Sequence, residues 1–400
     1  MVIKMIKLIK SEWSKFVESR KNRIVLLLLI GYLIGLVFYY VKLDREFFSI
    51  MEQNMRIQSF EANQKSNIIS ILEEHVEDYE KNPNEVAFLA IEGRTSTLLE
   101  DYYKAPKVND WRHNLELENS KFKNLIFGEK NEFIQETILK ARNQHPTKLK
   151  QQIMMNEFLL ENSMEPYLSP YKLNGVQFLT FLLKRHNPMI LIIFSIILSI
   201  DVFMGEIEEG SYKLYFTQPY SRKKIYWSKL LSILLFLIVI MVSLILIFFI
   251  IISMIYGIGK GDFPQVIGST KILISLTSNV DNLGNFQVIS TSGYLILGYV
   301  LLLFSVIMSI LLTVAFSILI NSISRTLGLI TGLIMLNYVF ESFLDNKSML
   351  RFWLPLSYLN IEQVIKGEVN ASYLLGITIT VFLSIILTAI SYGKFITDDL

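Results

Sequence analysis

The sequence predicts an all-α membrane protein that crosses the bilayer several times and carries one large domain outside it. The chain has 400 residues, of which 52% are hydrophobic and only 18% are charged. A soluble protein of this length would carry more charge. Six apolar stretches reach the roughly 17 to 25 residues that a membrane helix needs. These predicted spans are residues 24–41, 188–204, 230–256, 294–320, 327–344 and 373–392.

The first 23 residues precede the first span and mix apolar with basic side chains. Within residues 1–20, apolar positions recur every three or four residues, with lysines between them. This spacing predicts an amphipathic helix that lies in the headgroup region of the membrane. A disordered basic leader is the alternative, and the regular spacing argues against it. The following run, 24–41, lacks a small-residue cleavage site and is therefore predicted to be a retained anchor.

Basic residues in the short loops predict the orientation. With six spans, the N-terminal segment, the loop 205–229, the loop after the fourth span and the C-terminal tail all fall on one side, and all carry Lys or Arg. The loop 257–293, on the other side, has only Lys260 and Lys271. Positive charge marks the cytoplasmic side. We therefore expect a multi-pass protein of the plasma membrane with both termini in the cytoplasm.

The large segment 42–187, between the first two spans, is predicted to be a mostly helical extracytoplasmic domain. Apolar residues recur at helical spacing in three patches, around Phe48, Ile134 and Phe158. Prolines at 83, 106 and 146 are expected to break these helices. A second outer segment, 345–371, lies between the last two spans.

Signatures of catalysis or of a metal site are missing from the sequence. There is no cysteine, and the four histidines lack the i,i+3 or i,i+4 pairing that one helix face would need to bind a metal. The stretch GIGKGD (257–262) lacks the full phosphate-loop spacing and is predicted to be a loop. The net charge of +2 gives no case for a nucleic-acid partner. We expect no enzyme activity, no metal and no cofactor in this chain.

One charged segment between the second and third spans is unusually ordered: DVFMGEIEEGSYKLYFTQPYSRKKIYWSKLL (201–231). Acids and a glycine come first, then a short apolar helix ending at Pro219, then a basic cluster that suits anionic headgroups. Ser221 is in position to cap the next helix. The alternative is an ordinary positive loop with stray acids, and the order of the elements favours something more specific.

This stretch resembles the coupling motif of the permease subunits of ABC type-2 exporters. That motif runs from an acid at the end of the second span, through Gly-Glu-x-x-x-Gly-Ser/Thr, to Pro, Ser-Arg and a Lys before the third span. The middle, YKLYFTQP, has aromatics where the family more often has aliphatic residues. The resemblance covers residues 1–44 and 188–400. The matching residues are Asp201, Gly205, Glu206, Gly210, Ser211, Leu214, Pro219, Ser221, Arg222 and Lys229.

The resemblance implies a division of labour with other chains. Residues 1–23 would be the elbow helix, 205–229 the coupling-helix loop and 345–371 a re-entrant outer segment. ATP and Mg would bind to cytoplasmic ABC ATPase subunits, and this chain would work beside a second permease copy or a paralogue in a lipid membrane. The residues implied in ATPase coupling are Glu206, Glu208, Glu209, Gly210, Ser211 and Leu214.

Two glycine pairs could form the seam between two permeases. Small residues four apart allow helices to approach closely. The family places this seam at the first and fifth spans, and contacts within one subunit are the alternative. The candidates are Gly31, Gly35, Gly328 and Gly332.

The cargo is expected to be hydrophobic or amphipathic, such as a peptide (an antimicrobial peptide, for example), a lipid or a drug. No charged residues line the predicted spans; Asp201 and Glu341 lie near their ends. This placement disfavours a secondary transporter, which usually buries ionisable groups near the midplane. The main alternative to an exporter permease is a membrane sensor or immunity protein that binds an envelope or peptide ligand through its outer domain without transport.

Overall fold

The computed structural model divides the chain into two compact units. Met1–Val37 with Asn174–Leu400 form the first, named here the bundle unit, and Phe38–Leu173 form the second, the insert unit. Each unit is described by itself. The structure describes residues 2–74, 111–127, 146–167, 169–208, 221–274, 285–343 and 348–397.

The chain begins with two consecutive helices. Helix α1 spans Val2–Glu18, as the apolar spacing predicts, and its place in the headgroup region stays a prediction. Helix α2 spans Arg20–Glu74 and so runs far beyond the predicted end of the first span at residue 41. No glycine or proline follows Gly35 within α2, so nothing in the local sequence interrupts its hydrogen bonds.

Each of the other predicted spans falls in a helix, with shifted ends. The span predicted at 188–204 is made of α8 and α9, with a one-residue break at Ile200. Gly205 and Glu206 continue α9, so the predicted loop 205–229 is shorter than expected on both sides. The helices are α8 (Asn187–Ser199), α9 (Asp201–Glu208), α11 (Arg222–Tyr256), α13 (Thr291–Ile320), α14 (Ile323–Phe343) and α17 (Tyr373–Thr397).

Five stretches in the described part of the chain are long and apolar enough to cross a membrane. Helix α14 corresponds to the predicted fifth span, but its apolar part covers only Ile323–Asn337. The count of six spans therefore stays a prediction. The five stretches are Arg20–Ile50, Asn187–Glu206, Arg222–Tyr256, Thr291–Ile320 and Tyr373–Thr397.

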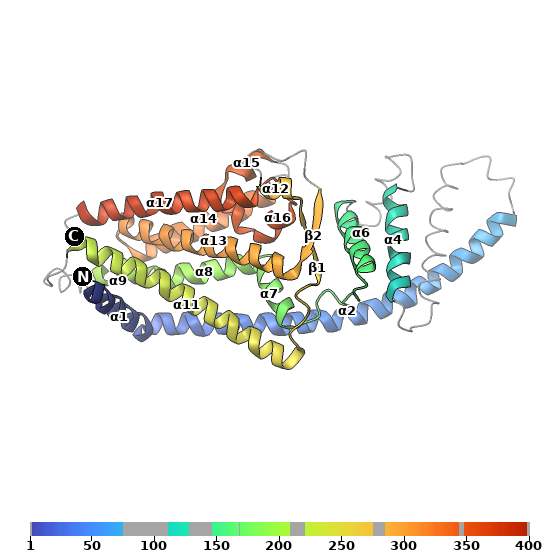
Figure 1. The fold of residues 1–400 in the computed structure, drawn as a ribbon, viewed down its shortest axis with the longest axis horizontal. Coiled ribbons are helices and arrows are strands. Elements are labelled where there is room, and N and C mark those ends of the chain that lie inside the picture. Colours follow the sequence, from blue (N-terminus) through green and yellow to red (C-terminus); the bar gives the residue numbers. More distant parts are fainter. Residues whose placement is uncertain are drawn as a thin grey trace. The chain divides into compact units, whose positions relative to one another are not determined.

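Helix α13 forms the centre of the bundle unit. It packs against α17, α8, α14 and α7, and Figure 1 shows it between α17 and α8. Its buried hydroxyls bond back to carbonyls of the preceding turn, as Ser305 does to Leu301 and Thr313 to Ser309. Such bonds satisfy polar groups that have no water beside them. The start of α1 and the end of α17 lie at the same end of this bundle (Figure 1).

A small antiparallel sheet, which the sequence did not predict, caps the other end of the mostly helical bundle. Strand β1 (Pro264–Gly268) pairs with β2 (Phe286–Ser290), with Val266 opposite Val288. Apolar and polar residues do not alternate strictly in PQVIG or FQVIS, so the pattern does not indicate strands. Gly268 lies so close to Gly367 that a Cβ on Gly268 would be 3.0 Å from the Gly367 Cα.

Four short elements complete this cap. Helix α16 packs against both β1 and α13, with Ile361, Val364 and Ile365 fully buried. The four elements are α12 (Thr270–Ile274), α15 (Met349–Trp353), the 3-10 helix η3 (Pro355–Leu359) and α16 (Ile361–Lys366). The last three lie in the segment predicted to dip back at 345–371, whose described part, 348–371, therefore contains a series of short helical turns.

Helix α7 (Gly175–Leu183) belongs to the bundle unit, whereas the sequence predicted an outer domain extending to residue 187. It is almost wholly apolar and packs against α11 and α13. Its first N–H groups donate to Gly257 and Ile258 O, at 3.0 and 2.8 Å. The predicted loop GIGKGD is indeed a loop, and its backbone receives this helix start, with Gly257 at φ 85°.

The insert unit contains the remainder of α2 and a pair of antiparallel helices. Helix α4 (Trp111–Phe127) packs against α6 (Pro146–Glu161). Asn156 Nδ2 donates to Glu118 Oε2 at 3.1 Å across this pair. Pro146 begins α6, where its missing N–H costs nothing, and the helical patch predicted around Phe158 is confirmed. The patch around Ile134 lies outside the described residues, as do Pro83 and Pro106.

Candidate functional site

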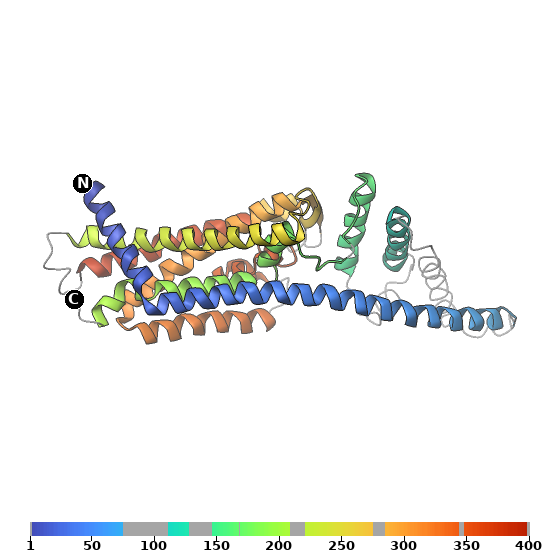
Figure 2. The ribbon, with the colours of Figure 1, turned by 90° about the horizontal axis from the view of Figure 1, so that it is seen from below.

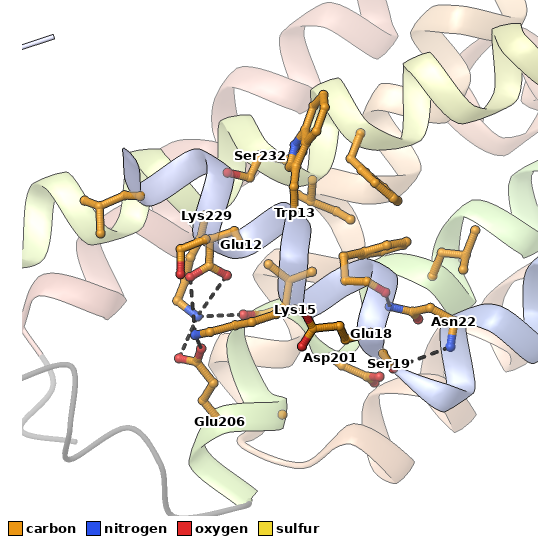
Figure 3. Close-up of a pocket in the computed structure, with 18 of the residues that line it drawn as sticks. Glu12, Trp13, Lys15, Glu18, Ser19, Asn22, Asp201, Glu206, Lys229 and Ser232 are labelled. Atoms are coloured by element: carbon orange, nitrogen blue, oxygen red, sulfur yellow. Dashed lines mark hydrogen bonds and ion pairs between the residues drawn. The ribbon is translucent and has the colours of Figure 1, made fainter. Parts of the chain in front are cut away.

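Glu206, in the last turn of α9, joins three helices at one end of the bundle. Its Oε1 accepts from Lys15 Nζ of α1 at 2.6 Å, and its Oε2 accepts from Lys229 Nζ of α11 at 2.7 Å. Figure 3 shows both lysines converging on the one carboxylate. Figure 2 shows why they can meet: α1 runs across α11 near its first turns. Glu206 therefore holds α1, α9 and α11 together.

Lys229 is the most buried cation of this cluster, with 4% of its side chain exposed. Besides Glu206, its Nζ donates to Val202 O at 3.0 Å and lies 3.9 Å from Glu12 Oε2. A buried charge is tolerated only when it is paired and hydrogen-bonded. Glu12 also lies 3.6 Å from Lys15, so two acids and two bases compensate one another.

A second ion pair fixes the junction of α8 and α9 to the start of α2. Lys21 Nζ lies 2.5 Å from Asp201 Oδ2 and also donates to Ile197 O at 2.7 Å. Ile197 is in the last turn of α8, where carbonyls lack helical partners and favour a cation. The break at Ile200 is thus held from outside by one lysine.

Aromatic side chains of α1 complete the attachment to α11. Trp13 Nε1 donates to Ser232 O at 3.2 Å, and its ring meets Phe236 edge-on with centroids 5.5 Å apart. The ring centroids of Phe16 and Phe236 are 4.0 Å apart. The predicted apolar stripe of α1 is therefore in part a packing surface against α11.

The residues predicted for ATPase coupling fall into two groups. Glu206 has the partners described above, and Glu208 Oε1 accepts from the N–H of Ile323, the first residue of α14, at 2.8 Å. An anionic group at a helix start is stabilising. Both acids thus have contacts within the chain that the sequence did not predict, and contact with an ATPase stays a prediction. Glu209, Gly210, Ser211, Leu214 and Pro219 lie outside the described residues.

The other motif residues take structural positions around this cluster. Ser221 is the N-cap of α11, but its side chain makes no capping bond. Arg222 Nη1 donates to Ile396 O of α17 at 3.2 Å. Gly205 faces Asp201, whose Cβ would be 3.3 Å from a side chain at 205.

The seam candidates all face open space. A Cβ placed on Gly31, Gly35, Gly328 or Gly332 would meet no atom within 4 Å in the described part of the chain. The alternative of close contacts within one subunit therefore finds no support at these four positions.

The sequence reasoning missed the partners contributed by α1. Lys15 and Lys21 entered the prediction only as basic residues that mark the cytoplasmic side, and Glu12 was not predicted to take part in the site. A usable signal was present: a membrane-end acid such as Asp201 or Glu206 requires a cation, and the lysines of the preceding amphipathic helix lie at the same membrane level.

A cavity of about 720 Å³ opens beside this cluster, between α1, the α8–α9 junction and α11. Its polar lining includes Lys15, Glu206 and Lys229 (Figure 3). Its apolar lining includes Phe16, Ile233 and Phe236. Its volume is within the range of small-molecule sites. Among the described residues no group of three acids or histidines could hold a metal ion, and of the four histidines only His113 and His186 are described.

Apolar helices of spanning length, gathered around α13 and bound by ion pairs at one end, define a multi-pass helical membrane protein. Residues 6–350 match the family described as ABC-2 family transporter protein, and the chain belongs to that family. It is therefore a permease of the ABC type-2 class, which implies association with an ABC ATPase subunit. No curated protein and no solved structure matches the chain.

Proposed function

We propose that this chain is the transmembrane subunit of an ABC exporter in a bacterial plasma membrane. Separate cytoplasmic ATPase subunits bind and hydrolyse ATP with Mg, and this chain carries no catalytic site or cofactor of its own. It crosses the membrane six times, with α14 as the fifth span, and both termini are cytoplasmic. The cargo is hydrophobic or amphipathic: a peptide, a lipid or a drug.

The observation that carries this proposal is the attachment of α9 to α1 and α11 through Glu206. Residues 209–220, which carry four of the ten motif residues (Gly210, Ser211, Leu214 and Pro219), connect α9 to α11. A force on this segment can move membrane helices as rigid bodies only if its two ends are firmly held. Lys229 and Glu206 supply that link at 2.7 Å, next to the point where the segment leaves α9.

Pairing with a second permease is supported by the open glycine faces. Gly31 and Gly35 lie on an exposed side of α2 together with Ile34, Leu27 and Leu28. Helices that approach one another in a membrane use such small residues. Gly328 of α14 is likewise exposed, so both predicted seam helices present unfilled surfaces.

The nature of the cargo is supported by the polar groups of the central helices. In α8 and α13, the buried hydroxyls of Ser195, Ser305 and Ser309 are bonded to backbone carbonyls. No ionisable side chain but tyrosine occurs between Asn187 and Ile200 or within α13. This environment suits an apolar solute better than a charged one.

Co-purification tests the proposal. The chain is tagged, solubilised gently, and compared with Glu209→Lys, a charge reversal inside the coupling motif. We expect an ATPase subunit with the wild type and its loss from the variant. Glu165→Lys, an exposed acid of the insert unit, is the matched control and should retain the ATPase. Glu206 is unsuitable for this comparison because its loss would also disturb the ion cluster.

If no ATPase accompanies the wild type in any mild detergent, the exporter proposal fails. The leading hypothesis would then be a membrane sensor or immunity protein that binds its ligand through residues 42–187. An ATPase retained by both variants would leave the permease class intact and exclude Glu209 as a docking contact.

A further inference from the structure

The cavity beside α1 has one polar corner that the ion cluster does not use. Glu12, Lys15, Lys229 and Glu206 are engaged with one another on one side. The junction between α1 and α2 contributes Glu18, Ser19 and Asn22 (Figure 3). Arg20 of the same junction also lines the cavity.

Asn22 is the most informative residue of this corner. It is 5% exposed, and its Nδ2 donates to Phe16 O at 3.2 Å. Its Oδ1 is buried and receives no hydrogen bond in the part of the chain that the structure describes. Buried acceptors in folded proteins are nearly always satisfied. Asn22 lines the cavity, so a molecule bound there is the source from which a donor for this oxygen can come.

Two charged side chains that also line the cavity, Arg20 and Glu18, can form further hydrogen bonds. Among the described residues, the guanidinium of Arg20 makes no hydrogen bond or ion pair. The carboxylate of Glu18 accepts one hydrogen bond, from Ser14 Oγ at 2.7 Å. The cavity lining thus includes two groups that can accept further hydrogen bonds, Asn22 and Glu18, and one planar cation, Arg20.

The position of the cavity points to a lipid. Arg20 is the first residue of one spanning stretch, and Glu206 is the last residue of another. The cavity therefore lies where the apolar core of the bundle ends. Its apolar lining includes Phe16, Leu198, Ile233 and Phe236, and all four belong to the hydrophobic core of the bundle unit.

We propose that this cavity binds a phospholipid with a primary ammonium headgroup, phosphatidylethanolamine, from the adjacent leaflet. The ammonium has three donors for Asn22 Oδ1 and the Glu18 carboxylate. The phosphate pairs with the Arg20 guanidinium, whose fork matches two phosphate oxygens. The upper acyl carbons contact the apolar lining. A zwitterion also suits the balance of charged groups that line the cavity, three cations (Lys15, Arg20, Lys229) against four carboxylates (Glu12, Glu18, Asp201, Glu206).

Native mass spectrometry of the full chain in detergent provides the test. The protein is titrated with phosphatidylethanolamine, phosphatidylcholine and phosphatidylglycerol that carry the same acyl chains. We expect phosphatidylethanolamine to bind roughly tenfold more tightly than the other two, since charge-assisted hydrogen bonds to the ammonium are lost in both. Soluble glycerophosphoethanolamine should not compete, because it lacks the acyl chains.

Two exposed positions separate the roles within the headgroup. Glu18→Gln should lower phosphatidylethanolamine binding to about the level of phosphatidylcholine, whereas Arg20→Gln should weaken the binding of all three lipids. Lys10→Gln, an exposed lysine of the same helix that does not line the cavity, is the matched control and should bind as the wild type does.

Equal binding of the three lipids, or a preference for phosphatidylglycerol, would overturn the proposal. Competition by glycerophosphoethanolamine at the same concentration would replace the lipid with a soluble ligand and would overturn it too. So would a Glu18→Gln variant that behaves like Lys10→Gln. The lipid test needs no ATPase, so its failure would leave the exporter proposal standing, and the reverse also holds.

Discussion

Lys15 and Glu206 lie 191 positions apart in the chain, and their side chains meet at 2.6 Å. The same carboxylate binds Lys229 at 2.7 Å. The two lysines differ in burial: 47% of the Lys15 side chain is exposed, against 4% for Lys229. One acid thus makes a surface contact to α1 and a buried contact to α11, and the two should differ strongly in energy.

Removal of the acid alone should be costly. In Glu206→Leu, Lys229 remains buried without its closest partner, a change that typically costs about 3–5 kcal/mol. The double variant Glu206→Leu/Lys229→Met buries no charge and should recover most of this loss. The midpoint of thermal unfolding in detergent measures both. A double variant less stable than Glu206→Leu would refute the idea that the buried ion pair is the source of the cost.

Removal of the exposed lysine should matter much less. Lys15→Gln breaks a contact that solvent screens, and such pairs contribute about 0–1 kcal/mol. We expect an unfolding midpoint close to that of the wild type, measured under the same conditions. A loss as large as that of Glu206→Leu would show that Lys15, and not Lys229, dominates the cluster.

The stability of the protein should rise with pH between about 8 and 10 because of Lys184, at the end of α7. Burial, followed by the nearby charge of Lys366, lowers the pKa of Lys184 to about 8. An unfolded lysine has a pKa near 10.4, so within this window the unfolded chain binds more protons than the folded one. The penalty for the buried charge is fully present below about pH 8 and disappears as the pH approaches 10.

Two substitutions at this position test the sign. Lys184→Met should raise the unfolding midpoint at pH 7, and the gain should shrink as the pH approaches 10. Lys184→Arg cannot deprotonate and should keep the penalty throughout. If both variants show the same pH dependence as the wild type, Lys184 is not the group responsible.

Leucine at the open glycines should leave the single chain intact and weaken its pairing. Gly31→Leu and Gly328→Leu place side chains where the described structure has no neighbour. We expect an unchanged unfolding midpoint and a smaller fraction of dimer by native mass spectrometry.

A third glycine provides the control for this experiment. Gly298→Leu would push against Leu183, and it should destabilise the chain by about 1–3 kcal/mol or more. Dimers that persist unchanged in both Gly31→Leu and Gly328→Leu would place the contact between copies elsewhere.

The features predicted best from the sequence are those that depend only on residues close together in the chain. Apolar runs marked the long helices of the bundle unit, α2, α8, α11, α13, α14 and α17, because length and composition alone decide whether a segment can span a membrane. The sequence could not predict the end of α2, since no helix breaker marks it. The sheet of β1 and β2 was missed because neither strand sequence alternates strictly between apolar and polar residues.

The sequence predicted the acids of the candidate site but not the lysines that pair with them. Asp201 and Glu206 stood out in the charged segment, but their partners Lys21 and Lys15 are almost two hundred residues away in sequence. Only the folded chain brings α1 across α11. The spare acceptor of Asn22 is equally invisible in sequence, because burial creates it.

The connection between α13 and α14 consists of only Asn321 and Ser322, with Asn321 in the left-handed conformation at φ 53°. A linker of two residues keeps the end of α13 and the start of α14 at a nearly constant distance. Helix α14 can swing about its first residue, but it cannot slide away from α13 without unwinding a turn. Glu208 holds that same first residue through the N–H of Ile323. Helix α14, one of the two helices proposed to form the seam, therefore has a fixed pivot at the end of the bundle where α9 arrives, and an opening along the proposed seam would widen with distance from it.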